Sequence, residues 1–409
     1  MTPTTIAATP TRSNDFQAIG LIGAAHFVSH VHMLVLPPLF LYVQAEFSVN
    51  YLELGLVIAV FNLISGVLQT PAGFLVDRTS ARTVLVGGLL LGALSLAAAT
   101  VMPTFFLFGL MFAVLGVANT VYHPADYALL SSRISAPRVG HALSIHIFAG
   151  FIGTAVTPAS MIILAGWLGW RGAFLVAAAL GLAVAATLML FGQSLAGREA
   201  ARARPQTGVT APGAGDWRVL MTWPVILNLI FFTLIAGVSI GMQNYSMFAL
   251  HALWGTPIAF GTTALTLYLM SSAFAVLLGG WICSRTNRQD VVAMVGLAVS
   301  GAALLPVAFF DLNAVVLLVF MSLSGFFNGV MQPSRDLIVR QVTPPGAFGR
   351  VFGFVTTGFN IGGVIMPPVF GYMMDNGTPN LVFIVTAMLS LAAIPTVMAT
   401  VANRPRGKA

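Results

Sequence analysis

The feature that most constrains this chain is a series of twelve apolar runs, each long enough to cross a bilayer as a helix. The runs are continuous rather than alternating, which excludes half-buried strands. Only 7% of the residues are charged and 58% are hydrophobic, whereas a soluble domain carries about 25% charged residues. We therefore expect an all-α, polytopic membrane protein, with helices over about residues 17–43, 52–76, 83–102, 104–131, 139–166, 171–192, 220–250, 259–283, 290–309, 312–338, 347–373 and 379–402.

The basic residues predict how these helices are oriented. With the N-terminus inside, all of the 18 Lys and Arg residues fall in cytoplasmic segments except Arg171 and Arg335. Such a bias is the positive-inside rule. The net charge of +7 is thus a topology signal and not a nucleic-acid surface, and both termini are expected in the cytoplasm.

A Gly-, Ala-, Pro- and Arg-rich stretch, "GQSLAGREAARARPQTGVTAPGAGDW", separates the sixth and seventh runs. Its composition is typical of a flexible linker. The expected organisation is a cytoplasmic tail over 1–16, a six-helix bundle over 17–192, a linker over 193–219, a second six-helix bundle over 220–402 and a tail over 403–409.

The two halves repeat each other. Adding 209 to residue numbers in the fourth and fifth runs reaches the same residue type in the tenth and eleventh, without a gap. The identities include Gly116 and Gly325, Asn119 and Asn328, Pro124 and Pro333, Gly153 and Gly362, and Pro158 and Pro367. Parallel repeats of six helices, with the binding site between them, are typical of secondary transporters.

The loop "GFLVDRTSAR" resembles the signature of the major facilitator superfamily, with matches at Gly73, Leu75, Asp77, Arg78 and Arg82. "GWRGAF" (Gly169–Phe174) is similar to a second pattern of that superfamily. "HF" followed by "LPP", "LQTPAGFLVDR" and "YHPAD" resemble the fosmidomycin-resistance-type exporters. The resemblance implies the major facilitator fold in a bacterial inner membrane, a monomer working by alternating access, and a small-molecule substrate with protons as partners.

The resemblance also implies a conformational latch at this loop, made by Gly73, Asp77, Arg78 and Arg82. Asp77 would sit at the positive N-terminus of the eleventh helix and hold the halves together on the cytoplasmic side. Arg78 and Arg82 could pair with acids or carbonyls. The alternative is that these charges only set the topology.

Three histidines lie in the first run, and ionisable residues in a membrane normally face the bundle interior or a water-filled cavity. His26 and His30 are four residues apart and share a helix face, whereas His32 lies about 160° away from His26. The pair could handle protons or substrate, because histidine titrates near physiological pH. It could instead be structural, or bind a metal if His123 or Asp126 supplied a third ligand.

"YHPAD" places His123 and Asp126 three residues apart on the fourth helix. Two such groups in a low dielectric shift each other's proton affinity and could exchange a proton with the cavity. The alternative is an ion pair of Asp126 with Arg133. Arg335 is the equivalent of Asp126 in the second half, and could form a gate or bind an anionic substrate; the alternative is neutralisation by Asp336.

Further cavity residues are expected on the seventh and eleventh helices, where amide and phenol groups could donate hydrogen bonds to substrate: Asn228, Gln243, Asn244, Tyr245 and Asn360. The chain carries no H-E-x-x-H motif, nucleophile elbow or phosphate-binding loop, so we expect no enzyme activity and no direct use of ATP. We assign no metal site and no cofactor.

The sequence thus favours a secondary active transporter that exports a small polar or anionic organic compound, or a drug, in exchange for protons. The alternative is an importer of an organic anion or a metal chelate.

Overall fold

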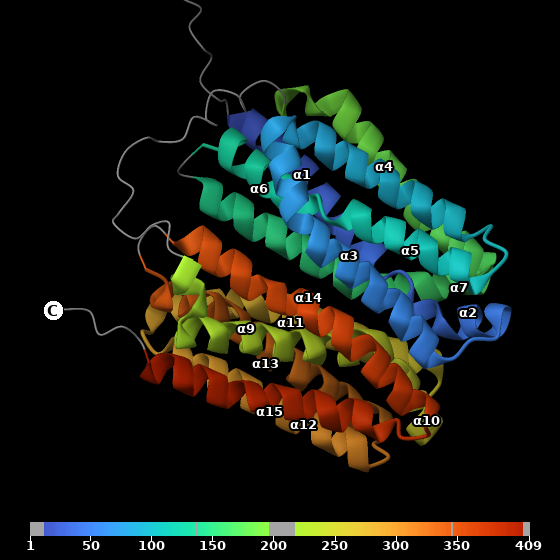
Figure 1. The fold of residues 1–409 in the computed structure, drawn as a ribbon. Helices are drawn as coiled ribbons and strands as arrows, with labels where there is room; N and C mark the ends of the chain where they lie inside the picture. Colours follow the sequence, from blue (N-terminus) through green and yellow to red (C-terminus); the bar gives the residue numbers. More distant parts are fainter. Residues whose placement is uncertain (1–11, 136–137, 196–216, 345–346, 404–409) are drawn as a thin grey trace, which may run out of the picture.

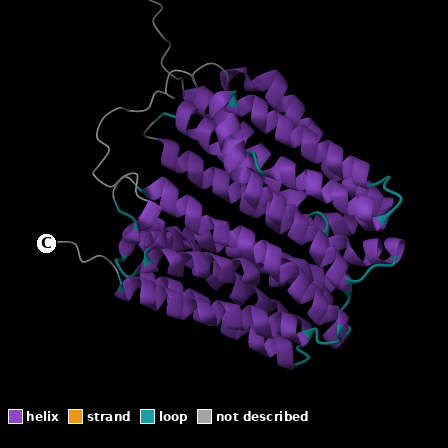
Figure 2. Ribbon diagram, viewed as in Figure 1, coloured by secondary structure: helices purple, strands orange, loops and turns teal. Residues whose placement is uncertain are grey.

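The computed structural model describes residues 12–135, 138–195, 217–344 and 347–403, and within these ranges the chain forms helices and no strand (Figure 2). The elements follow the order expected from the apolar runs. They are α1 (Arg12–Leu34), η1 (Pro37–Leu39), α2 (Phe40–Phe47), α3 (Tyr51–Arg78), α4 (Ala81–Ala99), α5 (Phe105–Asn119), α6 (Tyr122–Arg133), α7 (Val139–Phe191), η3 (Gly192–Leu195), η4 (Trp217–Met221), α9 (Trp223–Ile240), η5 (Gly241–Tyr245), α10 (Ser246–Trp254), α11 (Ile258–Arg285), α12 (Gln289–Phe309), α13 (Ala314–Val342), α14 (Phe348–Asp375) and α15 (Asn380–Ala402).

Eleven segments of the described chain are long and apolar enough to span a membrane. One of them, the 53-residue α7, would be roughly 80 Å long as a straight helix, far more than a bilayer of about 30 Å requires. Gly169 breaks it, with φ 71° and ψ 168° inside the helix. The two limbs correspond to the expected fifth and sixth helices, so the twelve-helix architecture holds.

Polar residues at the loop ends set where several helices begin. Asn50 and Glu53 form a capping box at the start of α3, which satisfies two backbone donors reciprocally. Ser80, Thr104 and Asn313 accept hydrogen bonds from the first turns of α4, α5 and α13. These caps satisfy backbone donors that the first turn of each helix would otherwise leave without a partner.

Two expected spans are interrupted near their middles. The fourth span breaks between α5 and α6, just before Pro124, since proline removes a backbone donor and crowds the preceding turn. The seventh span contains the π-helical turn η5, and such turns occur frequently at functional sites. The interruption therefore includes the predicted cavity residues Gln243, Asn244 and Tyr245.

The two halves lie side by side, α1–α7 in blue to green and α9–α15 in yellow to red (Figure 1). The helix pairs α3–α14 and α7–α11 join them.

The sequence repeat corresponds to equivalent helix crossings in the two halves. A Cβ on Gly153 would lie 2.6 Å from the Phe27 carbonyl oxygen, and one on its equivalent Gly362 would lie 2.7 Å from the Thr233 carbonyl oxygen.

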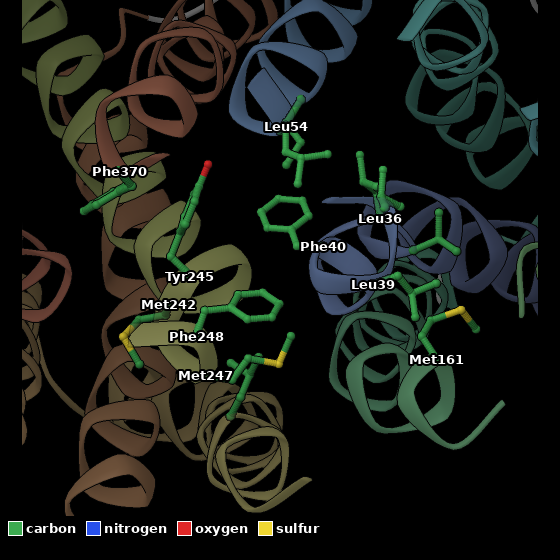
Figure 3. Close-up of a cluster of buried hydrophobic side chains, with 14 of the residues drawn as sticks. Leu36, Leu39, Phe40, Leu54, Met161, Met242, Tyr245, Met247, Phe248 and Phe370 are labelled. Carbon is green, nitrogen blue, oxygen red and sulfur yellow. The ribbon is translucent and has the colours of Figure 1, made fainter. Parts of the chain in front are cut away.

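The two halves share a buried hydrophobic core at one end of the molecule. We call the end where Arg12 and Ala402 lie the terminus end, and the other the far end. At the far end a single cluster draws residues from both halves. There Phe40 packs on Tyr245 and Phe248, with ring centroids 5.7 Å and 5.6 Å apart (Figure 3). At the terminus end each half has its own separate cluster.

Candidate functional site

Five polar side chains gather inside the N-terminal half where three helices meet. His26 and His30 come from α1, His123 and Asp126 from α6, and His146 from α7. Glycine makes this possible, because a Cβ on Gly150 of α7 would lie 2.6 Å from Nε2 of His26 and 2.8 Å from Nε2 of His30. We call these five residues and their surroundings the His–Asp cluster.

The geometry of the His–Asp cluster centres on His26. Its ring stacks on that of His146 with a centroid separation of 3.8 Å, and lies 5.3 Å from the ring of His123. Its Nδ1 is 3.5 Å from Oδ2 of Asp126. Nε2 of His146 is 3.9 Å from the same oxygen. One carboxylate oxygen therefore lies within 4 Å of two imidazoles, too far from either for a good hydrogen bond.

Asp126 is fully buried, yet neither of its carboxylate oxygens has a hydrogen-bond partner among the described residues. The same holds for Nδ1 of His26 and for both ring nitrogens of His146. Buried polar groups without partners are costly. The cluster therefore has unused capacity to hold a proton, an ion or a ligand group.

Access to the cluster comes from α6. His123 is exposed and Tyr127, one turn later, is 46% exposed. The face that carries them looks towards the other half, because Asp336 of α13 interacts electrostatically with Tyr127. These exposed polar side chains therefore face the other half, at a level where each half has its own hydrophobic core.

His30 and His32 have different surroundings. Nδ1 of His30 lies 2.8 Å from Oγ1 of Thr154, at the edge of the cluster. His32 points elsewhere: its Nε2 lies 2.9 Å from the carbonyl oxygen of Ala177, and its ring fills the space beside Gly181. The structure thus places His26 and His30 on one face of α1 and His32 on another.

His146 is a member of the cluster that sequence reasoning missed. The signal was present, since His146 lies within an apolar span, but the rotation of that helix could not be derived without its neighbours. Two other polar contacts were missed for the same reason. Buried Asp15 pairs with Arg138 at 2.8 Å, and Asp375 accepts hydrogen bonds from the first turn of α3.

In the second half, Arg335 does not pair with Asp126. Its Nε donates to Oδ1 of the adjacent Asp336 at 2.9 Å. Its guanidinium lies over the rings of Phe232 and Phe359, at 4.9 Å and 5.4 Å from their centroids. In this conformation Arg335 therefore forms an ion pair with Asp336, the alternative to the gate and the substrate site.

Two of the predicted cavity residues, Asn228 and Tyr245, donate hydrogen bonds to backbone carbonyls within the second half. Asn228 is buried and donates to the carbonyl of Pro224 at 2.7 Å. The Tyr245 hydroxyl donates to the carbonyl of Pro367 at 2.7 Å, Asn244 is buried and Gln243 is partly exposed. Asn360 instead packs between the halves, against Gly66 of α3.

The predicted latch residues lie at the terminus end, where the halves are apart. Asp77 and Arg78 are exposed, and nothing within the described residues lies within 4 Å of a Cβ added at Gly73. Arg82 binds within its own half, donating to the carbonyls of Leu188 at 2.9 Å and Met189 at 2.8 Å. Within the part of the chain that the structure describes, Asp77 makes no ion pair or hydrogen bond in this conformation.

Comparison with known proteins places this architecture in a family. The family model for the Major Facilitator Superfamily matches residues 22–261 and 229–409. The chain is 24% identical over 397 residues to the fosmidomycin resistance protein of Escherichia coli (strain K12), covering 96% of this chain and 94% of that protein. It is also 24% identical over 394 residues to a probable sulfoacetate transporter of Cupriavidus necator, covering 90% and 89%.

Solved structures show the same fold. A bacterial homologue of the human lysosomal transporter Spinster, in an inward-facing and unoccupied conformation, superposes with a TM-score of 0.74 at 14% identity, covering 97% of this chain and 96% of that one. The nucleoside transporter NupG superposes with a TM-score of 0.73 at 16% identity, covering 95% and 99%. With the family model matching both halves, this multi-pass membrane protein belongs to the Major Facilitator Superfamily and is a transporter, not an enzyme.

Proposed function

We propose that this transporter exports a small polar or anionic organic compound in exchange for protons, by alternating access. The observation that carries the proposal is Asp126, a fully buried carboxylate with two imidazoles beside it and no hydrogen-bond partner in the described chain. A negative charge in this position needs a positive charge nearby, because an isolated ion inside a membrane protein is strongly unfavourable.

A proton satisfies that requirement and can be exchanged with the cavity. The groups beside Asp126 are His26 of α1, Tyr122 and Tyr127 of α6, and His146 of α7. His30 and His123 pack on the ring of His26, and Asp336 of α13 interacts with Tyr127 from the other half. Exposed His123 connects the buried carboxylate to the cavity, so a proton reaching His123 has a short path to Asp126.

Export requires a conformation in which substrate enters from the cytoplasm. We place the terminus end in the cytoplasm, because it carries the excess of Lys and Arg, and the membrane as the bacterial inner membrane. With the terminus end in the cytoplasm, the conformation is open to the cytoplasm and closed at the far end, so that substrate enters from inside.

The chain would work as a monomer, with bundles over 17–192 and 220–402, a linker over 193–219 and cytoplasmic tails over 1–16 and 403–409. Residues 1–11, 196–216 and 404–409 lie outside the described structure.

Import of an organic anion or a metal chelate is the second candidate. Arg335 favours the anion, because its guanidinium lies over two aromatic rings and carries a positive charge. One relative is named as a sulfoacetate transporter. Direction of transport therefore has to be part of the test.

The test uses inside-out membrane vesicles that contain the transporter and a fluorescent pH probe. Once respiration has acidified the interior, fosmidomycin, sulfoacetate and L-galactonate are added separately, as the compounds named for relatives. Exchange predicts that a transported compound accumulates inside while protons leave. Asp126→Asn should abolish this proton release, whereas Asp290→Asn, the same change in the pair Arg288–Asp290, should keep it. Concentrative transport that persists without a pH gradient and without sodium would refute proton coupling.

A further inference from the structure

We propose that the His–Asp cluster binds a divalent first-row transition-metal ion, such as Zn²⁺, Co²⁺ or Ni²⁺, through His26, His123, His146 and Asp126. This rests on the proposed function in one respect: the cluster is taken as the place where the transporter exchanges cations with the cavity. This proposal differs from the sequence analysis, which assigned no metal site. There, metal binding by His26 and His30 required a third ligand from the fourth helix, and α6 offers two candidates, His123 and Asp126.

The ligand atoms converge. One ligand atom from each of His26, His123 and His146 lies within 4.8 Å of the other two. Tetrahedral Zn²⁺ with bonds of about 2.0–2.1 Å holds its nitrogens roughly 3.4 Å apart. The three nitrogens would therefore have to move closer by up to about 1.4 Å, and His123 is the exposed member of the set.

The carboxylate completes the set. Oδ2 of Asp126 lies 3.5 Å and 3.9 Å from the nearest nitrogens of His26 and His146, so it can become the fourth ligand with a small shift. Next to it, the hydroxyl of Tyr122 is buried without a hydrogen-bond partner in the described chain and interacts electrostatically with Asp126. A donor placed there orients a coordinating carboxylate, as outer partners do at metal sites.

The donor set selects the kind of ion. Three imidazoles and one carboxylate suit Zn²⁺, Co²⁺ and Ni²⁺, whereas Mg²⁺ and Ca²⁺ require mainly oxygen ligands. Cu(I) prefers sulfur ligands, and the one cysteine of the chain, Cys283, is hydrogen-bonded to Ser334 in the second half. A divalent ion also neutralises the buried charge of Asp126, so metal and protons compete for the same place.

The number of orphaned atoms separates this arrangement from ordinary packing of histidines, since structural His32 leaves only its Nδ1 without a partner and bonds through Nε2. Nδ1 of His26, both nitrogens of His146 and both oxygens of Asp126 are buried and lack hydrogen-bond partners in the described chain. His30, at the edge of the same cluster, has Thr154 as its partner. A cluster kept only for stability would be expected to satisfy its members as it does His30.

The test is Co²⁺ binding to purified, tag-free protein in detergent at pH 7.5, followed by visible absorption and by calorimetry. The expected result is one equivalent bound with the absorption of a four-coordinate ion, displaced by Zn²⁺ but not by Mg²⁺. The variants His123→Ala and Asp126→Asn should weaken binding by at least about 10–100-fold, the loss found even for outer partners. His141→Ala, an exposed histidine on the same helix as His146, should bind as the wild type does.

Absence of stoichiometric Co²⁺ binding, or equal binding by wild type, His123→Ala and Asp126→Asn, would overturn the metal site. Circular dichroism and size-exclusion chromatography establish that each variant is folded. The proton-release assay in metal-free buffer is scored separately. Proton-coupled export without Co²⁺ binding would remove this inference and leave the proposed function intact, whereas Co²⁺ binding without proton release would do the reverse.

Discussion

The carboxylate of Asp375 accepts hydrogen bonds from the backbone amides of Tyr51, at 3.0 Å, and of the following Leu52, at 2.8 Å. Asp375 ends α14 in one half and Tyr51 begins α3 in the other. A charge from one half therefore caps a helix of its neighbour, where the helix dipole favours an anion. Together with the aromatic contacts around Phe40, this contact keeps the far end closed.

Substituting Asp375→Asn should open the far end more often. An exposed anion at a helix N-terminus contributes about 0.3–1 kcal/mol, so the ratio of far-open to far-closed molecules should rise roughly two- to fivefold. Spin labels at Val101→Cys and Asp311→Cys, in a Cys283→Ser background, report the separation of the halves. Asp290→Asn serves as the control at the terminus end. An unchanged distance distribution in Asp375→Asn would show that the aromatic contacts alone close the far end.

Asp77→Asn should act in the opposite direction. Because Asp77 is exposed and makes no hydrogen bond or ion pair with the described residues in this conformation, the substitution should leave the melting temperature unchanged. It should slow transport, since the predicted latch forms only when the terminus end closes. Rates are measured in vesicles and normalised to inserted protein. A wild-type rate would remove the latch role.

His32→Ala should reduce stability and leave the pH dependence of transport unchanged. The ring is buried, bonds to the carbonyl of Ala177 and fills space beside Gly92 and Gly181. Loss of the hydrogen bond and the cavity left behind should cost about 2–4 kcal/mol. Thermal unfolding in detergent measures the change, with His141→Ala as the exposed control.

By contrast, His26→Ala and His30→Ala should each alter substrate affinity or shift the pH profile of transport. A shift of that profile with His32→Ala alone would reverse the roles assigned to these histidines.

Gly150→Ala should disable the His–Asp cluster in a folded protein. The added methyl group would collide with the rings of His26 and His30, at 2.6 Å and 2.8 Å. Overpacking of this kind costs about 1–3 kcal/mol, and displacing the rings should cost the larger part of transport activity. Gly140→Ala is the matched control on the same helix, since nothing described lies within 4 Å of its Cβ. Full activity in Gly150→Ala would mean that the positions of these rings do not matter for transport.

Gly169→Ala tests the break in α7. At φ 71° and ψ 168° the backbone lies in a region that is essentially restricted to glycine, so alanine should destabilise the protein by about 1–3 kcal/mol. No described atom lies within 4 Å of the added Cβ, so the effect is one of backbone conformation alone. Gly166→Ala, which has the same open surroundings and an ordinary φ, should not destabilise. Equal melting temperatures for the two variants would contradict this reason.

Much of the fold could be predicted from the sequence, because a bilayer leaves few choices. Apolar length specifies a spanning helix, and the positions of Arg and Lys predict its direction. The repeat of Gly153 in Gly362 predicted two similar halves, since a glycine at a close helix crossing is needed in both. In the structure, Asn50, Ser80 and Gly169 set helix boundaries through local chemistry that does not depend on the rest of the chain.

Tertiary structure alone decided which polar groups meet. Helical spacing put His26 and His30 on one face, but it could not bring His146 of α7 to within 3.9 Å of Asp126, because a helix pattern does not specify the rotation of its neighbours. Nor could it decide that Arg335 pairs with Asp336, or that Asp375 caps α3 across the halves. The sequence by itself determined where the membrane helices lie, since that depends on transfer of each segment into lipid. The packing of helices determined the cluster, the cavity and the closed end, since those depend on contacts between residues far apart in the chain.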